Sequence, residues 1–283
     1  MNVYTTKTDM RNRISSLIRE GKSIGFVPTM GFLHEGHLSL VEHARKENEI
    51  VVMSIFVNPA QFGPTEDFDT YPRDFERDAK MAETAGVDII FHPSAEEMYP
   101  FDGGIQIIAG NQSKALCGAS RPGHFDGVLK VIAKLFHIVS PSRAYFGMKD
   151  AQQLAIVETF VRDYDFPVEI RRVPIVREGD GVAKSSRNVR LTDLERQEAP
   201  IIYQALSKGM EEYLTTQDVQ KTIHVVAAKI EENSSGKIDY VSLLDYPSLQ
   251  PANEDTEQVL LATAVYFEKV RLIDNIIMST KKG

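Results

Sequence analysis

Two histidines three positions apart mark the stretch of this sequence best suited to chemistry. His34 and His37 lie in the run 28–37, which reads Pro-Thr-Met-Gly-Phe-Leu-His-Glu-Gly-His. An apolar segment, 24–27, precedes the run, and a helix-like segment, 38–45, follows it. A turn between a strand and a helix presents backbone N–H groups and the positive end of the helix dipole, so α/β proteins often hold phosphate there. We therefore expect a nucleotide site at this turn, with both histidines on one face of the first helical turn.

Imidazole N–H groups at this position would stabilise the negative charge that a phosphate gains under attack. Gly36 would let the backbone approach the ligand closely. Two alternatives stay open at this point. The histidines could be surface residues at a helix start, or they could be a zinc pair, although no third ligand is evident.

Two further segments carry groups that suit phosphate and ribose. In segment 146–150 (Phe-Gly-Met-Lys-Asp), Gly147 permits close backbone approach, Lys149 offers a point charge, and Asp150 could accept from ribose hydroxyls or cap a helix. Segment 183–188 (Ala-Lys-Ser-Ser-Arg-Asn) combines hydroxyls, a guanidinium and an amide, which suit a triphosphate. The alternatives are a plain capped turn for the first segment and a solvated linker for the second.

Two other loops could bind the second reactant. Asn58 and Gln61 follow a strand that looks buried on both faces, at the place where open α/β sheets bind ligands, and neutral amides suit a hydroxy acid. Arg121 and His124 stand in the loop 121–128, where they could bind an anion and donate a hydrogen bond. A turn set by Asn-Pro and a purely structural loop are the alternatives.

The elements that must position these residues alternate between strand and helix as far as about residue 175. The predicted helices are 9–20, 36–48, 74–85, 128–139 and 151–164, and the predicted strands are 24–27, 49–57, 87–91, 103–109, 144–147 and 168–173. This alternation predicts an α/β fold with a Rossmann-like, doubly wound parallel sheet. Beyond a boundary near Pro174 we expect a smaller α+β unit with helices 192–214 and 218–232 and strands 238–244, 259–267 and 270–278. The predicted domains are therefore 1–175, binding nucleotide and acid, and 176–283, a lid.

Composition bounds the class of protein. The 283 residues are 42% hydrophobic and 25% charged, which is ordinary for a globular chain of two domains. The net charge of −8 disfavours nucleic acid as a partner. No apolar run is long enough to span a bilayer, the first residues lack a secretory pattern, and Cys117 is the single cysteine, so we expect a soluble, cytoplasmic protein. Neither a Gly-x-Gly-x-x-Gly motif nor a P-loop motif follows a strand.

The order and spacing of these motifs resemble the pantoate–β-alanine ligase (pantothenate synthetase) family, within the nucleotidyltransferases that share a HIGH-type motif with class I aminoacyl-tRNA synthetases. The motifs are Pro-Thr-Met-Gly-x-Leu-His-x-Gly-His at 28–37, Asn-Pro-x-Gln-Phe at 58–62, Tyr-Pro-Arg at 71–73, Arg-Pro-Gly-His-Phe-x-Gly-Val at 121–128, Phe-Gly-x-Lys-Asp-x-Gln-Gln at 146–153 and Ser-Ser-Arg-Asn at 185–188. The resemblance covers essentially the whole chain. It implies condensation of pantoate with β-alanine through a pantoyl-adenylate, with ATP and Mg²⁺, in a homodimer.

The resemblance also implies roles for individual residues. The implied catalytic residues are His34, His37, Lys149 and Arg187. The implied ATP-binding residues are Met30, His34, His37, Gly147, Lys149, Asp150, Val176, Lys184, Ser185, Ser186 and Arg187. The implied pantoate-binding residues are Met30, Asn58, Gln61 and Gln153. No protein ligand for a metal is evident, and the Mg²⁺ would be held mainly by phosphates and water.

Two positions depart from the family's pattern, and two other functions compete. Cys117 stands where the family commonly has Glu, and Lys184 stands where an apolar residue usually precedes Ser-Ser-Arg-Asn. One competing function is a nucleotidyltransferase that makes a dinucleotide or CDP-type product and needs no amine site. The other is an inactive nucleotide-binding regulator, against which Lys149 and the 185–188 motif argue.

Overall fold

The computed structural model describes residues 1–64, 66, 68–101 and 103–280, and the chain divides into two compact units. The first unit comprises residues 1–110, 121–148 and 156–174. The second comprises residues 111–120 and 149–155 and the chain from 175 onward.

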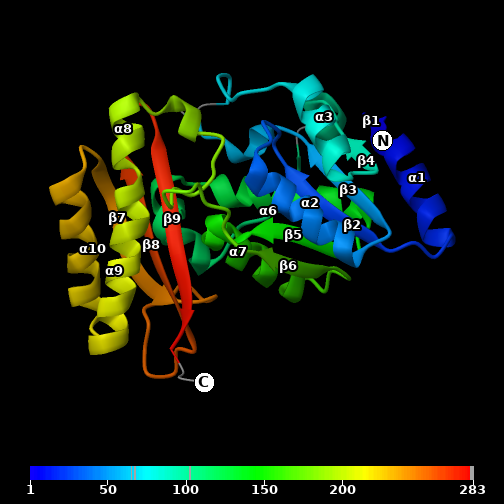
Figure 1. Cartoon of the computed structure of the whole chain (residues 1–283). Coiled ribbons are helices and arrows are strands. Elements are labelled where there is room, and N and C mark those ends of the chain that lie inside the picture. Colours follow the sequence, from blue (N-terminus) through cyan, green and yellow to red (C-terminus); the bar gives the residue numbers. More distant parts are fainter. Residues whose placement is uncertain (65, 67, 102, 281–283) are drawn as a thin grey trace. The chain divides into compact units, whose positions relative to one another are not determined.

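A six-stranded parallel sheet forms the centre of the first unit (Figure 1). Its strands are β1 (Asn2–Tyr4), β2 (Ile24–Thr29), β3 (Ile50–Ile55), β4 (Ile89–Phe91), β5 (Arg143–Gly147) and β6 (Glu169–Val173). They lie in the order β1-β4-β3-β2-β5-β6 with parallel neighbours. Most of β3 is buried, as a strand covered on both faces requires.

Helices cover both faces of this sheet. They are α1 (Lys7–Arg19), α2 (Glu35–Glu47), α3 (Phe75–Ala85), α4 (Ala95–Met98), α6 (His124–Val139) and α7 (Ala151–Asp163), and the first residues of α7 belong to the second unit. Val27 of β2 packs in one cluster with Val41 of α2 and Ala82 of α3. The neighbouring Phe26 points to the other face, where its ring meets Phe136 of α6 edge to face at 6.4 Å.

The strand order places a switch point between β2 and β5. Strands β3 and β4 follow on one side of β2, whereas β5 and β6, which come later in the chain, lie on the other side of β2. Ligands in doubly wound sheets bind beyond the carboxyl ends of the strands at such a point. The histidine turn follows β2, and Gly147 is the last residue of β5, so both predicted sites begin at this edge.

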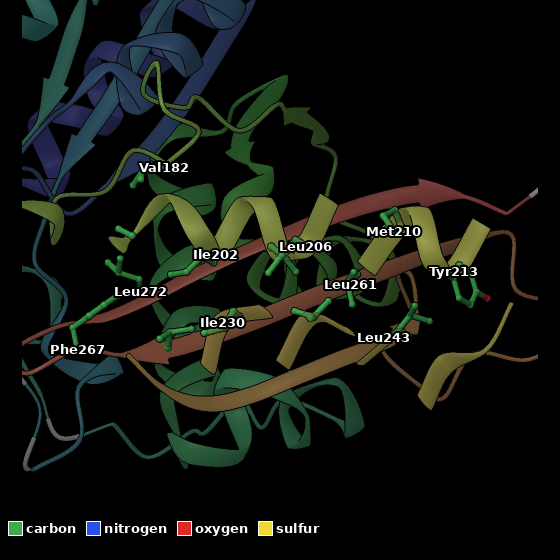
Figure 2. Packing of buried hydrophobic residues seen from close by; sticks show 14 of the residues in the cluster. Val182, Ile202, Leu206, Met210, Tyr213, Ile230, Leu243, Leu261, Phe267 and Leu272 are labelled. Atoms are coloured by element: carbon green, nitrogen blue, oxygen red, sulfur yellow. The ribbon is translucent and has the colours of Figure 1, made fainter. Parts of the chain in front are cut away.

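The second unit is built on a three-stranded antiparallel sheet, with β7 (Lys237–Asp245), β8 (Gln258–Tyr266) and β9 (Arg271–Ser279) in that order. Its helices are α5 (Leu116–Ser120), α8 (Asp193–Glu198), α9 (Pro200–Thr216) and α10 (Val219–Asn233). Leu206 of α9 and Ile230 of α10 pack with Leu261 of β8 in one apolar core (Figure 2). A Cβ at Gly209 would lie 2.3 Å from a methyl group of Val226, so α9 and α10 approach closely at this glycine. The predicted fold class, a doubly wound α/β sheet followed by a smaller α+β unit, is confirmed.

Two predicted elements are wrong. No strand forms over 103–109, where Ile105 and Ile108 are 83% and 75% exposed. An apolar strand needs a partner strand and a face to bury, and this segment finds neither within the described residues. The single predicted helix 192–214 is two helices, because Pro200 lacks an N–H group and begins a new helix. The short edge strand β1 was not predicted. Within the described residues, no helix is long and apolar enough to cross a membrane.

Candidate active site

Hydrogen bonds that cap the N-terminus of α2 fix the side chains of both histidines. The Gly36 N–H donates to His34 Nδ1 at 3.1 Å, and the His34 N–H donates to His37 Nδ1 at 3.3 Å. Their rings lie 4.1 Å apart between centroids. A ring nitrogen that accepts a hydrogen bond carries no proton, so each neutral imidazole has its proton on Nε2. Each ring therefore has an Nε2–H donor at the start of a 13-residue helix.

A buried carboxylate on α3 fixes the turn that leads to these histidines. Asp78 is 1% exposed and accepts from the Phe32 N–H at 2.6 Å and the Leu33 N–H at 2.7 Å. Burial raises the pKa of Asp78, and the two backbone donors oppose that rise. Gly31 has φ +85°, and a Cβ there would lie 2.9 Å from Asp78 Oδ2. The neighbouring Arg77 donates to the Leu33 carbonyl at 3.0 Å.

The amide of Gln61 lies in a buried hydrogen-bond network at the carboxyl end of β3. Gln61 belongs to the short 3₁₀ helix Pro59–Gln61 and is 8% exposed. Asn58 Nδ2 donates to Gln61 Oε1 at 3.0 Å, and Gln61 Nε2 lies 3.3 Å from the sulfur of Met30. The structure therefore brings together three of the four residues predicted to bind pantoate.

The loop before α6 holds the backbone of Gln61. Arg121 donates to His124 Nε2 at 3.1 Å, and a guanidinium can only donate, so His124 carries its proton on Nδ1 and donates it to the Gln61 carbonyl at 2.8 Å. Arg121 is itself paired with both carboxylate oxygens of Glu66, at 2.6 and 2.7 Å, which lowers the pKa of Glu66. The guanidinium predicted to bind an anion is thus already engaged by a carboxylate of the same unit. A Cβ at Gly127 would lie 2.0 Å from the Ala60 carbonyl oxygen, so α6 presses directly on this 3₁₀ helix.

At the end of β5 the backbone is accessible. A Cβ at Gly147 would meet no protein atom within 4 Å. This open space suits the predicted close approach of a ligand.

In the second unit, two adjacent residues of β9 anchor the segments predicted to bind phosphate. Asp274 is 5% exposed and accepts two hydrogen bonds from Arg177, at 2.6 and 2.9 Å. Asn275 donates to the Lys149 carbonyl at 2.9 Å. Arg177 pairs with Ala183 in an isolated β-bridge, and the Lys184 N–H donates to the Val176 carbonyl at 2.9 Å. The hairpin from 176 to 184 and Lys149 are therefore both attached to β9.

The Ser-Ser-Arg-Asn motif forms a tight turn after this hairpin. The Arg187 N–H donates to Ser185 Oγ at 3.3 Å, and the Asn188 amide donates to the Ala183 carbonyl at 3.0 Å. Lys184 Nζ lies 3.9 Å from Glu178 Oε1, so the charge added by Lys184 is partly balanced.

Neighbouring glutamines at the start of α7 differ in their surroundings. Gln152 is 6% exposed, and its amide bonds to the Gly118 N–H and to the carbonyls of Gln112 and Ala115. The side chains of Lys149, Asp150 and Gln153 make no hydrogen bond or ion pair within the described residues. These three predicted ligand-binding residues thus have uncommitted polar groups.

Cys117 takes part in a polar cluster of the second unit. Its sulfur lies 3.4 Å from the hydroxyl of Tyr240 and accepts from Arg271 at 3.3 Å, and Arg271 also donates to Asp239. Cys117, where the resemblance led us to expect Glu, therefore accepts a hydrogen bond from an arginine.

Sequence reasoning missed the residues that hold the site in place, chiefly Asp78, Tyr99, Arg177 and Asp274. The hydroxyl of Tyr99 donates to Asn58 Oδ1 at 2.7 Å across 41 positions of sequence. One signal was available, because Asp78 lies on the apolar side of its helix and a carboxylate there requires donors.

A doubly wound parallel sheet with a capped His-x-Gly-His turn at its switch point defines the class, namely α/β proteins with a ligand site at that edge. Residues 2–277 match the family described as pantoate-beta-alanine ligase. The chain is 58% identical over 283 residues to the pantothenate synthetase of Lysinibacillus sphaericus, and the match covers 100% of both chains. It is 53% identical over 282 residues to the pantothenate synthetase of Bacillus subtilis, and that match covers 100% of this chain and 99% of the relative.

Comparison with solved structures finds the same kind of protein. A pantothenate synthetase from Thermus thermophilus matches with a TM-score of 0.90 and 45% identity, over 98% of this chain and 99% of that one. A pantoate-beta-alanine ligase from Francisella tularensis, complexed with beta-gamma ATP and beta-alanine, matches with a TM-score of 0.81 and 33% identity, over 100% and 99%. The chain belongs to the pantoate–β-alanine ligase family, whose members form an amide bond.

Proposed function

We propose that this chain joins pantoate to β-alanine in two steps through a pantoyl-adenylate. A carboxylate oxygen of pantoate attacks the α-phosphorus of ATP, and the bond to pyrophosphate breaks. The amine of β-alanine then attacks the acyl carbon, its proton is lost, and AMP leaves. Membership of the family over residues 2–277 carries this proposal, and the ATP and β-alanine in the Francisella structure support the choice of substrates.

The first unit supplies neutral donors in this scheme. The Nε2–H groups of His34 and His37 act on the phosphates of ATP, where preorganised donors stabilise developing charge without reorganisation. Gln61 donates to the acid from its Nε2, with Met30 beside it. Pantoate needs no general base, because a carboxylate is already ionised near pH 7.

The second unit supplies cationic and hydroxyl groups. Lys149, Ser185, Ser186 and Arg187 hold the β- and γ-phosphates, and Lys184 adds a charge at the same segment. Gly147 at the end of β5, Asp150 and the backbone of Val176 receive the ribose and adenine. Gln153, whose amide is uncommitted in the described structure, binds pantoate. The division into domains 1–175 and 176–283, the latter acting as a lid, is likewise proposed. The compact units differ from it in that segments 111–120 and 149–155 belong to the second unit.

The proposed Mg²⁺ accompanies the phosphates of ATP. Within the described residues, no group of three or more His, Cys, Asp or Glu side chains could hold a metal ion. Mg²⁺ typically keeps several waters and binds substrate phosphates with few protein ligands, so a site built by ATP itself fits this chain. The ion would neutralise charge on the departing pyrophosphate.

We also propose a cytoplasmic homodimer. The cytoplasm supplies ATP, and the family resemblance implies two copies. Phe101, Ile105 and Ile108 are 84%, 83% and 75% exposed within one short stretch, and exposed apolar groups of this kind are typical of surfaces that a partner covers.

Release of AMP tests the proposed function. Protein is incubated with ATP, Mg²⁺ and pantoate, and β-alanine is then added. We expect AMP to accumulate only when both acids are present. Pyrophosphate release that does not depend on an amine would favour a nucleotidyltransferase, and absence of turnover would favour a nucleotide-binding regulator.

A further inference from the structure

We propose that Tyr99 is a positioning residue for the acid substrate, because it fixes Asn58 and, through Asn58, turns the NH₂ group of Gln61 toward pantoate. The inference rests on the proposed function, in which Gln61 binds pantoate. Tyr99, Asn58 and Gln61 all belong to the first unit.

Two backbone groups identify the two ends of the Asn58 amide. One end of it faces the Gly127 carbonyl at 3.1 Å, and a carbonyl only accepts, so that end is Nδ2. The other end faces the Ala60 N–H at 3.2 Å, and an N–H only donates, so that end is Oδ1.

The orientation of Asn58 then decides that of its two side-chain neighbours. Nδ2 can only donate, so the Gln61 atom 3.0 Å away is Oε1 and the opposite end of that amide is Nε2. Oδ1 can only accept, so the hydroxyl of Tyr99, 2.7 Å away, donates. The sulfur of Met30 near Gln61 Nε2 is a weak acceptor, so a substrate oxygen can compete for that donor.

The side-chain amide of Asn58 has a full set of hydrogen bonds within the protein. Its side chain is 1% exposed and makes two donated and two accepted hydrogen bonds, the full set for an amide with one bond per lone pair. Asn58 was predicted to bind pantoate, and that role stays a prediction. The geometry makes Asn58 the link between Tyr99 and Gln61.

The surroundings of Tyr99 keep its hydroxyl protonated, so that it can donate a hydrogen bond to Asn58. Lys130 Nζ and Lys134 Nζ of α6 lie 5.1 and 5.5 Å from the centre of its ring, within the range of cation–π contacts. Burial raises the pKa of Tyr99, so its hydroxyl stays protonated at neutral and mildly alkaline pH. Without this hydroxyl, Asn58 Oδ1 would keep only the Ala60 N–H, so the amide that positions Gln61 would lose one of the four hydrogen bonds that hold it.

The test compares Tyr99→Phe with Tyr164→Phe, a 65% exposed tyrosine of the same unit. Pantoate binding is measured as a dissociation constant by ligand-observed NMR, and the KM values for pantoate and ATP are measured in parallel. We expect Tyr99→Phe to weaken pantoate binding on the order of tenfold, as for the loss of one partner of a buried hydrogen bond, with the KM for ATP within about twofold of wild type. Tyr164→Phe should behave as wild type.

A double-mutant cycle with Gln61→Ala separates positioning from general loss of structure. If Tyr99 acts through Gln61, Tyr99→Phe adds nothing to pantoate Kd in the Gln61→Ala background. Additive effects, or unchanged pantoate binding in Tyr99→Phe, would overturn the inference. If Gln61→Ala alone leaves pantoate binding unchanged, the proposed role of Gln61 fails, which is a separate result. Thermal unfolding of each variant shows whether the fold is kept.

Discussion

The candidate site residues of the first unit differ from two of the second, Lys149 and Gln153, in how their polar atoms are used. In the first unit, His34, His37, Asn58 and Gln61 bond to one another or to backbone through atoms that fix their orientation. In the second unit, Lys149 and Gln153 have side chains with no hydrogen bond in the described structure, and β9 holds Lys149 only by its carbonyl. The difference suggests a division of labour. Fixed neutral donors suit recognition of an acid of defined shape, whereas a long cationic side chain can follow charge as pyrophosphate departs.

The largest effect expected from this comparison concerns Lys149. Lys149→Met should lower the rate of pantoate-dependent ATP–pyrophosphate exchange about 10²- to 10³-fold, because a charge-stabilising group is removed. Stability should not change, since the ammonium has no protein partner in the described residues. The measurements are exchange kinetics and thermal unfolding, with Lys229→Met of α10 as the matched control. A loss below about tenfold, or a clearly lowered Tm, would remove the distinction between the two units.

A smaller and more selective effect is expected at Gly127. The new Cβ of Gly127→Ala would lie 2.0 Å from the Ala60 carbonyl oxygen, so the 3₁₀ helix that carries Gln61 must shift. Overpacking of this kind costs about 1–3 kcal/mol. We expect pantoate binding to weaken about tenfold or more, measured by NMR titration, with ATP binding little changed. Gly104→Ala is the matched control, because a Cβ there meets nothing within 4 Å. Normal pantoate binding by Gly127→Ala would show that the first unit is not rigid at Gln61.

The sequence predicted the alternation of strands and helices and the turn with its histidines, because both depend on local patterns. The α2 turn is a short-range arrangement in which His34 caps its own helix. The contacts that hold the site in place join residues that are far apart in the sequence. Asp78 reaches Phe32 across 46 positions, and Tyr99 reaches Asn58 across 41, so no periodicity indicates either contact. The false strand at 103–109 has the same origin, since alternation cannot show whether a partner strand exists. The ligand-binding roles of the site residues stay predictions.

Transfer of an oxygen atom tests the central claim, that the acid is activated as an adenylate. Pantoate labelled with ¹⁸O in its carboxylate is incubated with the protein, ATP, Mg²⁺ and β-alanine, and the products are analysed by mass spectrometry. Attack of the carboxylate on the α-phosphorus, followed by cleavage of the acyl C–O bond, predicts one ¹⁸O atom in the phosphoryl group of AMP and none in pyrophosphate. AMP without ¹⁸O, or label in inorganic phosphate released with ADP, would contradict the account.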